Sequence, residues 1–477
     1  MLLCYYYLDY LGNNYYEGKM KNFKKILICL ILCVFTFGLV ACGDSEDNYV
    51  YPTANEATYS NGGLAVNKGD YVYFVNGYQS AANTEQDTDY VVGSLMIAKL
   101  DENGDIMLDE NGLMRDEHYR TMYSRLAGFE ATGLYIFGDY LYFTAQCQNN
   151  ESGDTEWASD RVDFNRIKLD GSGDVERVYQ SEVTYSNLEY QYYNDNNGVY
   201  LLVYESGSNL DDSSISNRLL RVDANSKEVS EVSRDVSSIV MPDIALDGSV
   251  QSVYENTFYV VQDSETDEYI LRRYNVLNNT SSDYTRFDYS ITAEFVGDRY
   301  VYITDDNSSM MRANYQQNGT FTYAGPTDTS NGECYLSADG NTIVYIEDNI
   351  IEFYINGSTE VSRDHVVVDE EGDSTVSTII VIGFANGRIY YYDDTNDMIK
   401  SVSVSSSDTS VTVIASVTDV NTSYFDLDDE YVYFYKTVGS NSYLHRLRIN
   451  NNHGEAEEML GVYIESDIPE EEETEEE

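Results

Sequence analysis

Cys42 is the residue whose surroundings most clearly indicate a chemical modification. It ends a stretch, Met20–Cys42, that begins with three lysines and continues as an uncharged apolar run from Ile26 to Val40. The small residue Ala41 separates that run from the cysteine. This order is typical of a secretory signal sequence with its cleavage site after a small residue. The thiol at the end of the stretch is the only side chain there that can take a lipid through a thioether bond.

The four residues Leu39-Val40-Ala41-Cys42 resemble the lipobox of bacterial lipoproteins. The resemblance implies that diacylglycerol is attached to Cys42 and that the chain is cleaved just before it. Because two acyl chains anchor a protein stably, we expect it to be lipid-anchored on the extracellular face of the bacterial cytoplasmic membrane. The alternative is an uncleaved transmembrane helix, since the apolar run approaches the lower length limit for one.

Composition distinguishes four segments outside residues 58–464. Residues 1–19 have no role in a signal peptide and are predicted to be upstream sequence translated in error, and residues 20–41 are predicted to be the lipoprotein signal peptide. Residues 42–57 are acidic and lack a hydrophobic period, which predicts a disordered tether. Residues 465–477 are nearly all Glu, and their mutual repulsion predicts a disordered tail.

One pattern recurs through residues 58–464: a short apolar strand, a turn of Gly, Asn or Asp, and a Tyr-rich strand that alternates with period two. A second hairpin follows each copy and is clearest early in the chain, as in Leu95–Leu100, Asn165–Leu169 and Arg218–Val222. Such turns supply the positive φ of tight hairpins, and the residues between them are typical of strands. Each copy therefore predicts four antiparallel strands and no helix. The eight copies begin at Gly69, Gly138, Asn197, Glu255, Gly297, Gly340, Asn386 and Asp429.

A lone four-stranded sheet cannot bury both faces, so the eight sheets must stack on one another. Radial closure predicts an all-β fold, a single β-propeller of eight four-stranded blades, or seven if one copy is an insertion. The copies, with Asn61-Gly62-Gly63-Leu64-Ala65, resemble a β-propeller domain of unknown function in Gram-positive bacterial lipoproteins. That domain is distantly similar to the propellers of low-density-lipoprotein-receptor-related proteins, whose Tyr-Trp-Thr-Asp signature is absent here. The resemblance implies the fold and no reaction.

The longest predicted connections lie on one face of the propeller, which favours that face for binding. They are Gln79–Val92, Gln146–Asp163, Glu205–Ser216 and a blade-to-blade segment, 109–132. Trp157, the one Trp of the chain, is the candidate ligand-contact residue, because an aromatic ring can stack on a sugar or anchor a partner. The alternative is that Trp157 packs its loop onto its own blade. The 47 Tyr are expected to pack mainly between blades.

Catalytic and metal-binding patterns are weak. The turns Asp101–Asp105 and Asp170–Asp174 hint at calcium but lack the distal Glu of a full loop, so we expect no metal and no cofactor. The four His are scattered, and no Gly-x-Ser-x-Gly motif or phosphate-binding Gly loop occurs. Cys147 and Cys334 either form one disulfide or remain two free thiols.

The formal net charge of −55 repels nucleic acid and anionic lipid headgroups, so neither is an expected partner. The sequence therefore predicts a monomeric, membrane-anchored platform that binds or scaffolds a protein or a cell-wall glycan. One alternative is an extracellular carbohydrate-active enzyme that uses an Asp/Glu pair, which the many carboxylates neither identify nor exclude. A structural surface spacer is the other alternative.

Overall fold

The structure is a computed structural model. It divides into two compact units, Met1–Val50 and Tyr51–Glu477, and the strands of the described residues lie in the second. Cys42 and the predicted signal peptide lie outside the described residues, among which no helix has the length and hydropathy to span a bilayer. The described residues are 49–59, 61–78, 93–107, 118–123, 133–149, 156–184, 188–195, 198–209, 213–242, 256–337, 340–347, 350–359, 364–366, 379–404, 411–438, 441–449 and 457–461.

The strands form eight antiparallel sheets, the blades, in chain order. Blade 1 contains β1 (Thr58–Tyr59), β2 (Ala65–Lys68), β3 (Tyr71–Val75), β5 (Leu95–Lys99) and β6 (Tyr119–Tyr123). Blade 2 contains β7 (Tyr135–Phe137), β8 (Tyr140–Asn149), β9 (Glu156–Lys168) and β10 (Glu176–Gln180). Blade 3 contains β11 (Leu188–Asn194), β12 (Val199–Ser208), β13 (Ile215–Asp223) and β14 (Val229–Ser233). Blade 4 contains β15 (Val236–Val240), β16 (Thr257–Gln262), β17 (Tyr269–Asn275) and β18 (Thr280–Phe287).

The second half of the chain repeats the same arrangement. Blade 5 contains β19 (Thr292–Val296), β20 (Tyr300–Thr304), β21 (Met310–Asn314) and β22 (Thr322–Tyr323). Blade 6 contains β23 (Glu333–Leu336), β24 (Thr342–Glu347), β25 (Ile350–Ile355) and β26 (Asp364–Val366). Blade 7 contains β27 (Ile379–Ala385), β28 (Arg388–Asp393), β29 (Met398–Ser403) and β30 (Val411–Ser416). Blade 8 contains β31 (Val420–Leu427), β32 (Tyr431–Val438), β33 (Asn441–Arg448) and β34 (Glu458–Met459).

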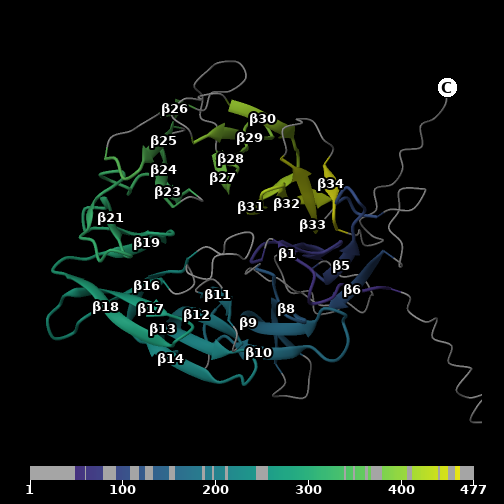
Figure 1. The fold of residues 1–477 in the computed structure, drawn as a ribbon, viewed down its shortest axis with the longest axis horizontal. Helices are drawn as coiled ribbons and strands as arrows, with labels where there is room; N and C mark the ends of the chain where they lie inside the picture. The colour runs from purple at the N-terminus through teal and green to yellow at the C-terminus, as the bar shows by residue number, and fades with distance from the viewer. Residues whose placement is uncertain are drawn as a thin grey trace, which may run out of the picture. The chain divides into compact units, whose positions relative to one another are not determined.

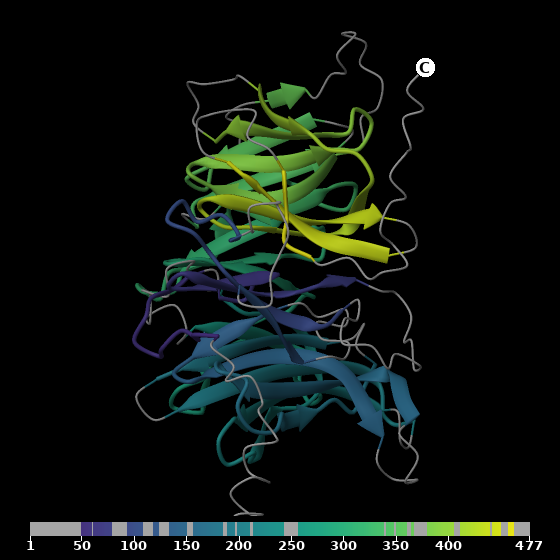
Figure 2. The same ribbon diagram turned by 90° about the vertical axis from the view of Figure 1, so that its right-hand side faces the viewer.

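The blades follow one another around a ring, with first strands such as β19, β27 and β31 toward the middle and fourth strands such as β14, β18 and β30 toward the rim (Figure 1). The eight-bladed β-propeller predicted from the repeats is therefore confirmed. Blade 8, in yellow, lies beside blade 1, in purple and blue, in both views (Figure 2). The short strand β4 (Gly77–Tyr78), which leaves blade 1 after β3, pairs with β33 of blade 8 and joins the two ends of the ring.

The hydrophobic core lies between neighbouring blades. One cluster joins Val72 and Phe74 of blade 1 to Tyr433 and Leu444 of blade 8. Corresponding clusters join each successive pair of blades from blade 2 to blade 8. Tyrosine provides many of the fully buried side chains, which confirms that its main role is packing between blades. These residues include Tyr73, Tyr142, Tyr192, Tyr193, Tyr259, Tyr302, Tyr390, Tyr391 and Tyr433.

The turn residues act as the sequence predicts. In blade 7, Asn386 and Gly387 join β27 to β28 with φ of 52° and 70°. Two consecutive positive φ values are what a two-residue hairpin requires, and Asn-Gly adopts them at low cost. The predicted Tyr-rich repeats all fall on second strands of blades, from β3 to β32. These strands are buried over most of their length, since each lies between two neighbouring blades.

Three segments that were predicted as loops contain strand residues. The segment 109–132 contains β6, the fourth strand of blade 1, whose residues are all only partly buried and so carry no strong hydrophobic signal. The connections Gln146–Asp163 and Glu205–Ser216 are largely strand, because polar residues there pair through their backbones. At the start of the propeller domain, residues 53–56 form a turn. Lys68 Nζ donates hydrogen bonds to carbonyls of this turn, one of them to Glu56 O at 2.6 Å.

Candidate functional site: two hairpin arms on blades 2 and 3

Two hairpins extend beyond the strand length of the other blades. We call β8–β9 and β12–β13 the arms, because their strands have 10 and 13 residues, and 10 and 9 residues. The second strands of blades 5, 6 and 7 have only five or six residues. The long strands of the first arm, in blue, run to the edge of the stack in Figure 2. Each arm joins the second strand of its blade to the third, so both arms lie on the face where long connections were predicted.

A β-bulge bends the arm of blade 2. Gln146 of β8 pairs with Val162, but the next residue, Cys147, pairs with Ala158, so that three residues of β9 have no partner on β8. Bulges of this kind bend and twist a strand pair and re-aim the residues beyond them. Trp157 lies just past the bulge, in register with Gln148. The structure therefore places Trp157 within a strand near the end of the arm, where the sequence predicted a loop.

The arm of blade 3 ends in an exposed apolar residue. Ser208 pairs with Ile215 at the last rung of the hairpin, and the side chain of Ile215 is 81% exposed. Two hydrogen bonds close this end, from Asn209 N to Ser214 O and from Ser206 Oγ to Asn217 Oδ1. A single exposed apolar residue is ordinary on a surface. Ile215 stands out because it is the most exposed large apolar residue among those described and lies at the end of a fixed hairpin.

A buried carboxylate holds the base of this arm. Glu205 of β12 is fully buried and accepts hydrogen bonds from Arg218 Nη2 at 3.0 Å and from Tyr179 of blade 2 at 2.6 Å. The backbone N–H of Glu182, after β10 of blade 2, donates to the same carboxylate at 3.0 Å, and the Glu182 carboxylate pairs with Arg218. Burial together with the Glu205 charge raises the pKa of Tyr179 far above its usual range, so Tyr179 acts as a donor.

This cluster fixes the direction of the arm. Each oxygen of Glu205 has at least one donor, which offsets the desolvation of the buried charge. Two of its partners come from blade 2, so the base of the blade 3 arm is tied to the neighbouring sheet. Sequence reasoning missed the cluster. Its only sequence signal was an acidic residue in a strand that otherwise reads as apolar.

Arginine–tyrosine stacks occupy the opposite face, where first and second strands are joined by short turns. In blades 2, 3, 5 and 8, an arginine of the third strand covers the ring of the tyrosine at the start of the second strand. The guanidinium carbon lies 3.7–4.4 Å from the ring centroid, and the pairs are Arg166–Tyr140, Arg221–Tyr200, Arg312–Tyr300 and Arg446–Tyr431. Each arginine also donates a hydrogen bond of 2.6–2.8 Å to a turn of the next blade. These stacks link neighbouring blades, so their four guanidinium groups are already engaged in contacts within the protein.

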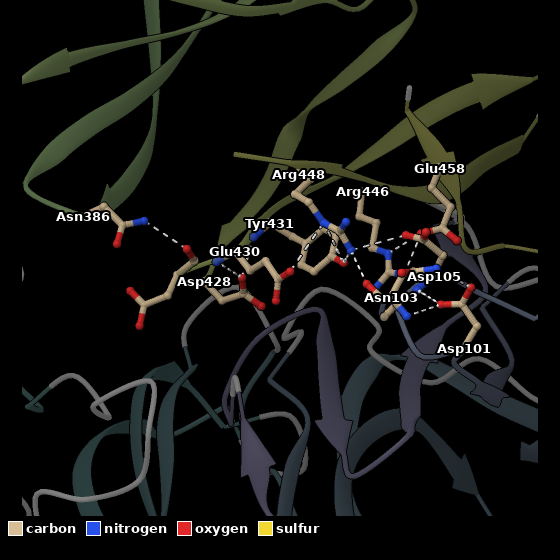
Figure 3. A network of polar contacts seen from close by, with 12 residues as sticks. Asp101, Asn103, Asp105, Asn386, Asp428, Glu430, Tyr431, Arg446, Arg448 and Glu458 are labelled. Atoms are coloured by element: carbon tan, nitrogen blue, oxygen red, sulfur yellow. Dashed lines mark hydrogen bonds and ion pairs between the residues drawn. The ribbon is translucent and has the colours of Figure 1, made fainter. Parts of the chain in front are cut away.

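The last stack forms part of the joint between blades 8 and 1 (Figure 3). Arg446 is 1% exposed, pairs with Glu458 at 2.6 Å and donates to the carbonyl of Gly104 in blade 1. Arg448 donates to the carbonyl of Asn103 in the same turn at 2.7 Å. The turn Asp101–Asp105, a weak calcium candidate in the sequence, is therefore part of the ring closure.

The acidic turns bind their own backbones. Asp101 accepts hydrogen bonds from the N–H groups of Asn103 and Asp105, and Asp170 accepts one from Ser172. These backbone bonds, and the side-chain contact of Ser172 with Asp170, keep the pKa of both carboxyl groups below the usual value. No group of three metal-ligating side chains gathers within the part of the chain that the structure describes.

Cys334 is a free thiol on β23, so a disulfide between Cys147 and Cys334 is not formed in the structure. Burial, with the nearby charge of Glu294, raises the pKa of Cys334 to about 12. A thiol with so high a pKa is almost entirely protonated at neutral pH and is a poor nucleophile. Cys334 is therefore unsuited to thiol catalysis.

No protein-family model and no curated protein matches this sequence. Solved structures similar to it include apo AztD from Citrobacter koseri, at 11% identity and TM-score 0.39 over 76% of this chain and 94% of that one. A Myceliophteria thermophila Cps50 (Swd1) β-propeller domain matches at 9% identity and TM-score 0.34, over 58% and 87%. A putative 6-phosphogluconolactonase from Bacteroides fragilis matches at 10% identity and TM-score 0.35, over 68% and 94%. The assignment of the fold here rests on the strand pairing, which is that of an eight-bladed β-propeller.

Proposed function

We propose that the protein is a membrane-anchored extracellular lipoprotein whose propeller binds a protein or cell-wall glycan partner through the two arms. The observation that carries the proposal is Ile215, exposed at the end of an arm whose base is held by the buried Glu205 cluster. A preorganised surface loses less conformational entropy when it binds than a mobile loop does. The blade 3 arm therefore combines an exposed apolar side chain with a fixed base, which favours partner binding.

The position of Trp157 on the blade 2 arm also supports the proposal. Its backbone lies near the end of the arm on the adjacent blade, beyond the bulge that re-aims that arm. Tryptophan is enriched among the residues that contribute most to binding. The opposite face is occupied by blade-to-blade contacts, which favours the arm face as the binding surface.

Binding through the arms is tested with three variants of the chain that begins at Cys42: Trp157→Ala, Ile215→Ser and the control Val413→Ser. Val413 is an apolar residue 45% exposed on the outer strand of blade 7, so it matches Ile215 in chemistry but lies away from the arms. We expect the two arm variants to lose most of the capture of partner from envelope extract or of binding to purified cell-wall sacculi. The control should bind normally. Equal binding by all three variants would exclude the arms.

Anchoring is tested separately in cells. Incorporation of labelled palmitate should be lost in Cys42→Ser, because the proposed thioether needs the thiol. Labelling that persists in this variant would refute the lipid anchor. It would leave binding through the arms to be judged by the first experiment.

A further inference from the structure

The fourth strand of blade 3 ends before the blade 3 arm does. β14 lies on the rim side of β13 (Figure 1) and pairs with it only as far as Leu219, which lies opposite Ser233. Just beyond, Asp235 has a φ of 55° and the chain continues into β15 of blade 4. β13 itself extends to Ile215. Within the part of the chain that the structure describes, the rim side of residues 215–217 therefore has no neighbouring strand.

The hydrogen bonds of the arm show which backbone groups this gap leaves open. Asn209 N donates to Ser214 O at 2.6 Å, and the same register continues without a bulge to the base of the arm. Antiparallel partners alternate between hydrogen-bonded and non-hydrogen-bonded pairs, so the even-numbered residues of β13 bond to β12. The N–H and C=O groups of Ile215 and Asn217 therefore point away from β12, toward the side where β14 has ended.

This open edge carries no charge and has an apolar tip. Residues 213–217 are Ser-Ser-Ile-Ser-Asn, whereas the outer strand of blade 4, β18, carries Asp283 and Arg286. Charged side chains on an edge strand oppose pairing with another chain. The side chain of Ile215 is 81% exposed and lies on the same face of β13 as that of Asn217. Apolar surface and open backbone groups therefore coincide at the end of the arm.

The edge is held in an extended conformation by the Glu205 cluster. Arg218, the next residue toward the base of the arm, pairs with the buried Glu205 and with Glu182. Asn209 Nδ2 donates to Glu182 Oε2 at 3.1 Å, so the network also reaches the end of the hairpin. A strand that pairs here meets a backbone that is already ordered, which lowers the entropic cost of binding.

We propose that this edge binds an extended segment of another polypeptide, which continues the line of β14 and exchanges main-chain hydrogen bonds with Ile215 and Asn217. The inference rests on the proposed function and makes the partner of the arms a protein. Alternating N–H and C=O groups at strand spacing match a polypeptide backbone, and sugar hydroxyls have no such repeat. Because the net charge is −55, two copies of this chain repel each other, which favours a neutral or basic segment of a different protein.

Peptide binding tests the pairing on the chain that begins at Cys42. The probe is a fluorescent heptapeptide of alternating valine and threonine with a lysine at each end. Its control is the same peptide N-methylated at its three central residues, which removes donors from both peptide edges and leaves the charge unchanged. In anisotropy titrations we expect the probe to bind about tenfold more tightly than the control, the effect of about one main-chain hydrogen bond. Equal affinity, or no binding of the probe, would overturn the proposal.

Two variants locate the binding. Asn217→Pro removes the outward N–H and no bond to β12, and proline is tolerated at such edge positions. Asn217→Ala keeps that N–H and, like the proline variant, loses the side-chain contact with Ser206. We expect Asn217→Pro to weaken probe binding about tenfold and Asn217→Ala to bind like the wild type. Equal affinity of the two variants would overturn the assignment to this edge. If Asn217→Pro fails to fold, Ile215→Pro compared with Ile215→Ala takes its place.

Capture from envelope extract separates this inference from the proposed function. Loss of capture in Ile215→Ser with equal capture by Asn217→Pro and Asn217→Ala would overturn strand pairing and leave the arms as the binding surface. Normal capture by both Trp157→Ala and Ile215→Ser would refute the arms themselves. A wild-type chain that dimerises in analytical ultracentrifugation, with an Asn217→Pro variant that does not, would place a second copy on the edge and overturn the choice of partner.

Discussion

Arg446→Met gives the sharpest measurement of how much the ring closure contributes to stability. Methionine keeps the length and apolar stem of the side chain but removes the guanidinium, which is 1% exposed, contacts Glu458 and Gly104, and covers Tyr431 at 4.3 Å. Breaking a buried ion pair by removing one partner costs about 3–5 kcal/mol. The side chain of Glu458 is 26% exposed and regains water, so we expect about 3 kcal/mol, the low end of that range.

The matched control is Arg286→Met on blade 4. Arg286 pairs with three carboxylates, those of Asp263, Glu268 and Asp283, but its side chain is 43% exposed. If the number of ion pairs set stability, Arg286 would matter more than Arg446. Because solvent screens exposed pairs and lets their partners rehydrate, we expect no resolvable change in Arg286→Met.

Urea denaturation followed by tyrosine fluorescence and by far-ultraviolet circular dichroism measures both variants. The free energy of unfolding follows from the shift of the midpoint at an unchanged slope. A cost of less than about 1 kcal/mol for Arg446→Met would refute the reasoning from burial. An equal cost for the two variants would refute it too.

Three further predictions concern other buried polar groups. Lys400→Met leaves the fully buried Asp393 without its ion-pair partner 2.6 Å away, so it should destabilise by about 3–5 kcal/mol, and a double variant with Asp393→Asn should recover part of that loss in the same urea assay. Burial raises the pKa of Asp393, but the hydrogen bonds from Lys400 and from Asn396 outweigh this effect and leave the pKa below the usual Asp value. The ion pair therefore stabilises the fold at pH values above the usual Asp pKa. Its contribution should be lost below about pH 4 in acid titrations. Iodoacetamide at about pH 8 should label Cys334 only after unfolding, because its pKa is raised to about 12, and rapid labelling of the folded protein would contradict this. Gly63→Ala forces the added carbon onto a carboxylate 2.1 Å away and should cost about 1–3 kcal/mol, whereas Gly138→Ala, with no atom within 4 Å, tests the positive φ of 60° alone.

The arms show where sequence reasoning succeeded and where it stopped. From length and composition, the sequence predicted that the connections Gln146–Asp163 and Glu205–Ser216 and the residue Trp157 lie on the binding face. It described them as loops because their residues are polar, and polar strands lack the hydrophobic alternation on which strand prediction depends. The third strands of blades 5 and 6, β21 and β25, pair as in every other blade, which confirms the second hairpin expected after each copy.

By itself, the sequence determined the local structure of this protein: alternating tyrosine-rich strands, turns with residues that accept positive φ, and an eightfold repeat that can bury its faces only by stacking. Those features depend on neighbours a few residues apart. Tertiary structure alone decided which polar groups are buried together, because ring closure brings Leu64 to Asp426 and Gly104 to Arg446 across hundreds of residues. The cost of a buried charge depends on such partners and not on the residue's own type. The rigid base of the blade 3 arm therefore became visible only in the folded chain.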